Sequence, residues 1–184
     1  MVHHLSRVQM EHFSIPANQT SINFDNVFTG ALPDLIVVGL VSDADLANGY
    51  QRNPFNFQKF GVSRIELKRN GTFRPSEGYT LSFATDQYIK AYSTILQELE
   101  CDTGDKSVSL TPCKWANGYT VYAFKIFDVP IGPGTYGSRS KSATKSARLE
   151  VSFTAAVSEN IKVVLLYQML GRIEFDRFNV VLVL

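Results

Sequence analysis

The chain has 184 residues, and 45% of them are hydrophobic, with 13 Phe and 8 Tyr. Its 18 Lys and Arg against 17 Asp and Glu leave a formal net charge of +1, so the overall charge gives no reason to expect a nucleic-acid or membrane partner. The length fits one domain over residues 1–184, and the longest apolar run is well short of the roughly 20 residues that span a bilayer, so we expect no membrane insertion.

The N-terminal segment has no apolar core followed by small-residue cleavage signals, so we expect no secretory peptide and a chain that is not secreted. Val8, Met10 and His12 alternate with polar residues, which predicts a half-buried first strand ending at Ile15. After a turn at residues 17–19, a second short strand is expected around residues 22–24.

An apolar, β-branched run without helical spacing follows at Leu35–Val41 and predicts a strand buried on both faces, as in a sandwich. Residues 42–49 begin with a capping residue and end in Gly, which is consistent with one or two helical turns or with a structured loop. Further on, Ser63, Ile65 and Leu67 alternate with charged residues ahead of Asn70-Gly71, and this pattern predicts a tight hairpin with Phe73 on its return arm.

One helix is predicted, over about Asp86–Leu99, with Thr85 as its cap. Its expected apolar face consists of Tyr88, Ile89, Tyr92, Ile95, Leu96 and Leu99.

The C-terminal half predicts further strands. Tyr119–Phe127 is apolar on both faces and is expected to be a central strand. Residues 128–147 are expected to form a long loop, and Leu149, Val151 and Phe153 alternate as in a strand. Two last strands, Ile161–Met169 and Arg172–Leu182, are expected on either side of residues 170–171. We therefore predict an all-β jelly-roll sandwich of about eight antiparallel strands with one flanking helix.

The stretch Val27–Phe57 joins a VVGLV strand to an NPFNF element, and shorter motifs lie at Phe28–Pro33, Ala116–Thr120 and Arg172–Arg177. In order and spacing these segments resemble the hexon-like major capsid protein family of Polinton (Maverick) elements and of adintovirus-like and adomavirus-like viruses. The resemblance implies a double jelly roll, of which this chain has the length for one barrel, and we expect it to be the C-terminal half of a longer subunit.

The same resemblance implies a structural role without catalysis. The chain would be a capsid subunit rather than an enzyme, self-assembling into trimeric capsomers that meet neighbouring capsid subunits in the virion, after synthesis in the host cytoplasm or nucleus. The motif residues themselves fit structural roles: Gly39 allows close backbone approach, Pro54 fixes an extended turn, and Phe55 and Phe57 would anchor a loop into the core.

Candidate chemical sites are sparse, and we expect no cofactor and no metal. His3, His4 and His12 lack partner ligands at recognised spacing. Cys101 and Cys113 are expected to be reduced, with a single disulfide between them as the alternative. Two carboxylate pairs could in principle hold calcium or act as acid and base, but they fit cap, turn and ion-pair roles better; they are Asp43 with Asp45 and Glu174 with Asp176.

A basic run of Arg139, Lys141, Lys145 and Arg148, with interspersed serines, is the candidate contact for genome phosphate or a neighbouring subunit, although a solvated loop is the favoured interpretation. Two alternatives remain open. One is a jelly-roll module that binds a ligand, receptor or glycan, with Trp115, Tyr119 or Tyr136 stacking on sugars, and the other is a host-retained copy with a different role.

Overall fold

The computed structural model describes residues 2–28, 32–47, 50–69, 71–99, 101, 109–126, 146–175 and 181–183, and of residues 2–6, 74–77, 170–175 and 181–183 it describes the backbone alone. The strands are β1 (Val2–Ile15), β2 (Ser21–Phe24), β3 (Leu35–Ser42), β4 (Val62–Arg69), β5 (Thr72–Thr80), β6 (Val121–Lys125), β7 (Ala147–Phe153), β8 (Ile161–Phe175) and β9 (Val181–Val183). The helices are α1 (Asp43–Leu46), α2 (Ile89–Glu98) and α3 (Pro112–Ala116).

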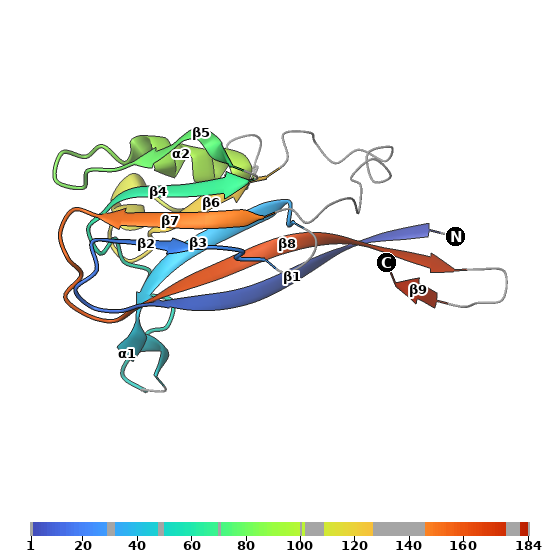
Figure 1. Ribbon diagram of the computed structural model, residues 1–184, viewed down its shortest axis with the longest axis horizontal. Helices are drawn as coiled ribbons and strands as arrows, with labels where there is room; N and C mark the ends of the chain where they lie inside the picture. The colour runs from blue at the N-terminus through green and yellow to red at the C-terminus, as the bar shows by residue number, and fades with distance from the viewer. Residues whose placement is uncertain are drawn as a thin grey trace.

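The first four strands pair with the next four in nested order, the first with the last and the innermost two with each other. β1 pairs with β8, β2 with β7, β3 with β6 and β4 with β5, all antiparallel. Further pairing of β3 with β8 and of β4 with β7 joins these pairs into two sheets, ordered β1-β8-β3-β6 and β2-β7-β4-β5. This order is that of a jelly roll, which confirms the predicted fold class. In Figure 1, β7, β4 and β2 lie above the long strands β8 and β1 of the other sheet.

The core lies between the two sheets and is filled by alternate residues of the strands. β7 shows the alternation in full, because every second residue from Ala147 to Phe153 is buried. β3, at the centre of its sheet, is mostly buried on both faces, as its apolar run predicts. The large side chains that are fully buried come from both sheets and from the connections: Trp115, Tyr122, Phe124, Ile15, Ile36, Leu40, Ile65, Leu67, Ile95, Ile126, Leu149 and Ile161.

The β4–β5 hairpin forms where it is predicted. Lys68 pairs with Phe73 and Arg69 with Thr72, and Gly71 has a φ of +82°, the left-handed geometry that favours glycine in such turns. Asn70 lies outside the described residues.

The predicted boundary between the last two strands, at residues 170–171, is wrong. β8 runs without a break from Ile161 to Phe175, because Leu170 and Gly171 pair with Ser6 and Leu5 of β1, which is itself 14 residues long. The pair β1 and β8 therefore continues beyond the sandwich as a ribbon, against whose end β9 pairs (Figure 1).

The prediction that β6 is central is also wrong. β6 lies at the edge of its sheet, is shorter than predicted, and is apolar on both faces because α2 packs against it. Lys125 of β6 and Glu98 of α2 approach to 3.7 Å, which adds an ion pair to this contact.

The helix begins later than predicted, at Ile89, because a tight turn occupies the preceding residues. Ser82 and Gln87 bridge across this turn, in which Asp86 has a φ of +54° and the Thr85 hydroxyl donates to Ser82 instead of capping the helix. The predicted apolar face is correct in its middle, but Ile89 and Leu99 at its ends are exposed.

Two buried tyrosines at the α2 side of the core give a matched test of this packing. The Tyr79 hydroxyl donates to the carbonyl of Ala123 at 2.7 Å, whereas the Tyr122 hydroxyl has no hydrogen-bond partner among the described residues. Burial raises the pKa of both tyrosines, so both stay protonated. We expect Tyr79→Phe to cost about 1–2 kcal/mol and Tyr122→Phe to leave the free energy of unfolding unchanged or higher, as measured by urea denaturation. A larger loss from Tyr122→Phe than from Tyr79→Phe would contradict this assignment.

Candidate self-association surface

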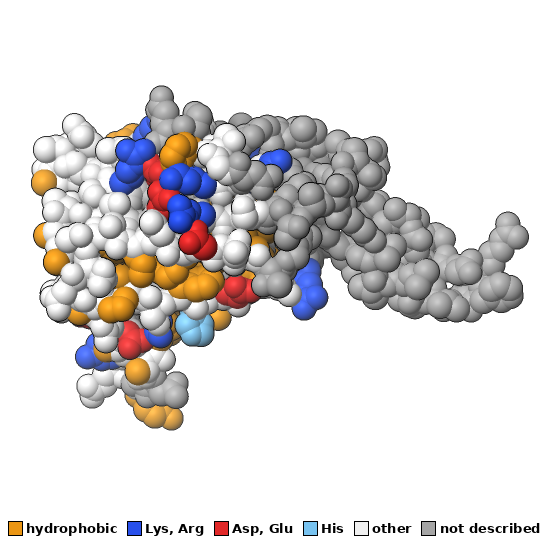
Figure 2. All heavy atoms as spheres, viewed as in Figure 1, with side chains coloured by type: hydrophobic (Ala, Val, Ile, Leu, Met, Phe, Trp, Pro, Cys, Tyr) orange, Lys and Arg blue, Asp and Glu red, His pale blue; other side chains and the backbone are white. Residues whose placement is uncertain are grey.

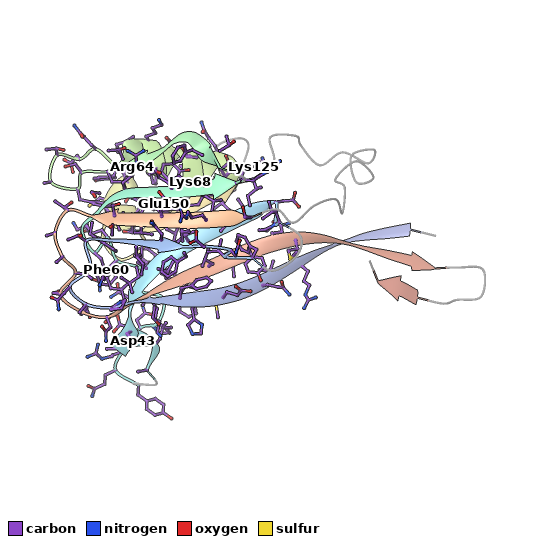
Figure 3. All side chains as sticks on the ribbon, in the orientation of Figure 1. Asp43, Phe60, Arg64, Lys68, Lys125 and Glu150 are labelled. Atoms are coloured by element: carbon purple, nitrogen blue, oxygen red, sulfur yellow. The ribbon has the colours of Figure 1, made fainter. Side chains whose placement is uncertain are left out.

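The outer faces of the two sheets differ in chemistry. On the β2-β7-β4-β5 sheet the outer face carries alternating charges that pair across strands. Lys68 of β4 donates to Glu150 of β7 at 2.7 Å, and Glu150 also accepts from Arg148 at 3.4 Å. Figure 2 shows red and blue side chains in one band on this side of the molecule, and Figure 3 labels Arg64 and Lys68 on β4 beside Glu150 on β7.

Two carboxylates directly oppose each other within this band. Glu66 pairs in register with Glu150, a like-charge arrangement that is unfavourable by itself. Each carboxylate has its own cation, because Arg64 donates to Glu66 and Lys68 forms an ion pair with Glu150. Glu66 is buried against Gly78, where an added Cβ would approach the Glu66 side chain to 2.6 Å. The band thus satisfies its own charges.

Arg148 belongs to this band. Its guanidinium pairs with Asp25 as well as with Glu150, and the hydrogen bond from Arg148 holds the pKa of Asp25 below its usual value. Arg148 is therefore engaged with two carboxylates of its own chain. The other members of the predicted phosphate-contact run, Arg139, Lys141 and Lys145, lie outside the described residues.

The family-like motifs meet on the outer face of the other sheet. The Phe57 ring of the NPFNF element lies against Gly39 of β3, so closely that an added Cβ at Gly39 would come within 2.5 Å of the ring. The backbone of Phe57 also bridges to Tyr119 and accepts from Thr120 at 2.9 Å. Three separate motifs of the sequence therefore form one packed cluster: VVGLV (residues 37–41), NPFNF (residues 53–57) and ANGYT (residues 116–120). Gly39 has the close-approach role predicted for it.

Phe55 and Trp115 of this region do not have the roles predicted for them. Phe55 is 72% exposed and does not anchor the loop, whereas Asn53 orders this turn by accepting from the backbone N–H of Phe55 at 3.0 Å. Trp115 is fully buried, so it has no face free to stack on a sugar, contrary to that alternative. Tyr119 is exposed, and Tyr136 lies outside the described residues.

The other candidate groups do not converge. Within the described part of the chain, no three His, Cys, Asp or Glu residues gather as a metal-binding group. Cys101 and Cys113 are both free thiols, as predicted. Asp43 and Asp45 lie in the first turn of α1 and pair with different cations, Lys162 at 3.4 Å and Arg52 at 3.1 Å.

The structure describes the remaining candidates in part. His12 is exposed on β1, and the backbone of His3 and His4 lies in the same strand, but the side chains of these two residues are outside the described set. The same holds for the side chain of Glu174, and Asp176 lies outside the described residues altogether.

The outer face of β1, β8 and β3 carries exposed apolar side chains. Met10 is opposite Leu166, which in turn is opposite Val37, so that these three residues form a row across three strands. Met10 is 66% exposed and Leu166 44%, and Val8 beside them is 58% exposed. We call Val8, Met10 and Leu166 the apolar stripe. Phe57 covers this face at Gly39, but the apolar stripe lies open among the described residues.

The prediction of a half-buried β1 is correct, but the buried side is the opposite one. Phe13 and Ile15 face the core, and Glu11 is on their side, where its carboxylate accepts from the Tyr167 hydroxyl at 2.8 Å. Burial, followed by contact with Glu11, raises the pKa of Tyr167. The apolar alternation predicts that Val8 and Met10 face inward. Glu11 lies on the inward side instead, where the hydrogen bond from the Tyr167 hydroxyl satisfies its carboxylate.

No helix in the described part of the chain has both the length and the apolar character needed to cross a bilayer.

Comparison with known proteins gives similarities in sequence and in structure. No family model matches the chain. Uncharacterized protein F54H12.2 of Caenorhabditis elegans is 24% identical over 123 residues, which make up 66% of this chain and 29% of that protein, so the chain spans less than a third of the length of this curated relative. The crystal structure of mavirus major capsid protein aligns with 100% of this chain and 41% of its own, with a TM-score of 0.49 and 9% identity.

Proposed function

We propose that the chain is a structural, capsid-like subunit that acts by self-association. The observation that carries this proposal is the contrast between the outer faces of its two sheets. One face presents charges that are paired within the chain, whereas the other leaves Val8, Met10 and Leu166 open to solvent. Exposed apolar residues that adjoin one another on the face of a sheet favour a protein partner, because contact removes their surface from water.

The finer form of the proposal is one barrel of a hexon-like double jelly roll, the C-terminal half of a longer subunit. Its supports are the motif resemblance to the Polinton, adintovirus-like and adomavirus-like capsid family and the packing of three of those motifs into one cluster around Gly39 and Phe57. In this form the subunit assembles as a trimeric capsomer, contacts neighbouring capsid subunits, and resides in the virion. A jelly roll by itself supports many functions, so the fold is not the argument.

We further propose that the chain is not an enzyme. Its described titratable side chains at the surface are mostly engaged in ion pairs of its own, as Arg148 is with Asp25 and Glu150. A general acid or base would need a geometry in which such a group faces a substrate rather than its own chain.

The proposal is tested by measuring solution mass. Light scattering is carried out on the chain over a range of concentrations, for the wild type and for Met10→Lys, Leu166→Lys and Asn23→Lys. We expect the wild type to associate with rising concentration, the first two variants to weaken association, and Asn23→Lys, on the exposed face of β2, to match the wild type. A wild-type mass that stays monomeric at high concentration, with an intact circular dichroism spectrum, would exclude self-association of this chain.

A further inference from the structure

The free edge of β1 is the starting point. β1 is the edge strand of its sheet, 14 residues long, and pairs with β8 through 14 consecutive residues without a register shift. Apart from this ladder to β8, residues 2–15 make no backbone hydrogen bond with the described residues. An unpaired edge of this length offers a row of N–H and C=O groups to another strand.

The other edges of the two sheets are protected in ways that β1 is not. β2 has only four residues, β5 contains Pro75 and pairs with β4 through an irregular register, and β6 is packed against α2. Short edges, proline, bulges and covering helices are the usual means by which proteins prevent edge pairing. β1 has no proline and no lysine, and it exposes Val8 and Met10.

The sequence of β1 is complementary to itself in one antiparallel register. Arg7 and Glu11 are symmetric about Gln9 and lie on the same side of the strand, because side chains alternate. A two-fold axis through Gln9 places Arg7 of each copy opposite Glu11 of the other. On the other face of the strand, the same axis places Val8 of each copy beside Met10 of the other copy. Charge and apolar pairs are thus satisfied together, and a shift by one residue would lose this match.

From this edge and this symmetry we infer that β1 pairs antiparallel with β1 of a second copy of the chain, about a two-fold axis at Gln9. The β1-β8-β3-β6 sheet of one copy then continues into the same sheet of the other copy. Val8 and Met10 bring the apolar stripes of both copies together. This inference rests on the proposed function and deepens it, because it names the surface and the register of one two-fold contact between copies, which is separate from the three-fold contacts within a trimeric capsomer.

The first test places a cysteine on the two-fold axis. In a Cys101→Ser, Cys113→Ser background, Gln9→Cys brings two thiols opposite each other with Cβ atoms about 4.5–5.5 Å apart, close enough for a disulfide after small adjustments. We expect mild oxidation to convert this variant to a covalent dimer, whereas Asn23→Cys, exposed on edge strand β2, stays monomeric on a non-reducing gel.

The second test exchanges the charges. Glu11→Arg or Arg7→Glu turns two attractive contacts into two repulsive ones, so we expect each to weaken self-association about tenfold, as measured by sedimentation. The double variant Arg7→Glu, Glu11→Arg restores attraction across the axis and should return to the wild-type dissociation constant. Melting temperatures check that loss of the Tyr167 contact to Glu11 leaves the chain folded.

The outcomes separate this inference from the proposed function. If the chain associates but Gln9→Cys forms no more covalent dimer than Asn23→Cys, or the double exchange is no better than the single ones, the β1 pairing is wrong and self-association through another surface stands. If the chain remains monomeric and Gln9→Cys does not cross-link, the inference and the proposed function both fail.

Discussion

Trp115→Ala should destabilise the protein by about 3–5 kcal/mol, because it empties the space of the largest fully buried side chain. Trp115 is positioned by the short helix α3, whose first turn is capped by the Thr111 hydroxyl accepting from the N–H of Lys114 at 3.3 Å. From there its ring packs against α2, the preceding turn and β6, with ring centroids 5.8–6.4 Å from those of Phe83, Tyr88, Tyr92 and Tyr122.

Trp115→Phe is the matched control. It keeps an aromatic ring in the site but loses the indole N–H, which donates to the carbonyl of Val121 at 3.0 Å, so we expect a smaller cost of about 1–3 kcal/mol. Urea denaturation followed by far-UV circular dichroism measures both variants, and near-UV circular dichroism reports whether the aromatic packing under α2 is lost. If Trp115→Ala unfolded at the wild-type urea concentration, the side chain would not be the centre of this packing.

Gly39→Val is expected to destabilise the protein by about 1–3 kcal/mol, although valine favours strands more than glycine does. The reason is the Phe57 ring, which occupies the space that a Cβ at Gly39 would need. β propensity and steric overlap predict opposite signs at this position, so the measured change in the free energy of unfolding decides between them.

A double-mutant cycle with Phe57→Ala isolates the contact. Once the ring is removed, Gly39→Val should cost little or raise stability, because the valine then fills the vacated space and its strand preference is no longer opposed. Equal costs of Gly39→Val with and without Phe57 would mean that the backbone, rather than this ring, requires glycine there.

Much of the fold follows from local patterns. The alternation in β7, the continuous apolar run of β3 and the Asn70-Gly71 turn each contain enough information to place a strand or a hairpin. The edge position of β6 and the continuity of β8 do not, because they depend on partners distant in sequence. A strand that is apolar on both faces is consistent with a central position or, as here, with a helix packed over an edge.

The candidate surface was less predictable than the fold. Val8 and Met10 belong to a correctly predicted strand but face outward, because the strand buries Phe13 and Ile15 on its other side. The alternation of Phe13 and Ile15 with the polar residues His12 and Ser14 is a signal that could have identified the buried face. The pairing of Arg148 with Asp25 had no such signal, since 123 residues separate them and only the β2–β7 register brings them together.

The pairing of the first long strand with the last one also bears on how the protein is made. β4 and β5 adjoin in the chain and can pair early, whereas β1 needs Ile161–Phe175, which the ribosome makes only after the intervening strands β2 to β7. Contacts of such long sequence separation form slowly. We expect β1 to leave the ribosome exposed on both of its edges, so that neighbouring nascent chains on one polysome can compete with β8 for it. Synthesis rate and chaperone supply would then decide the yield of correctly closed barrels.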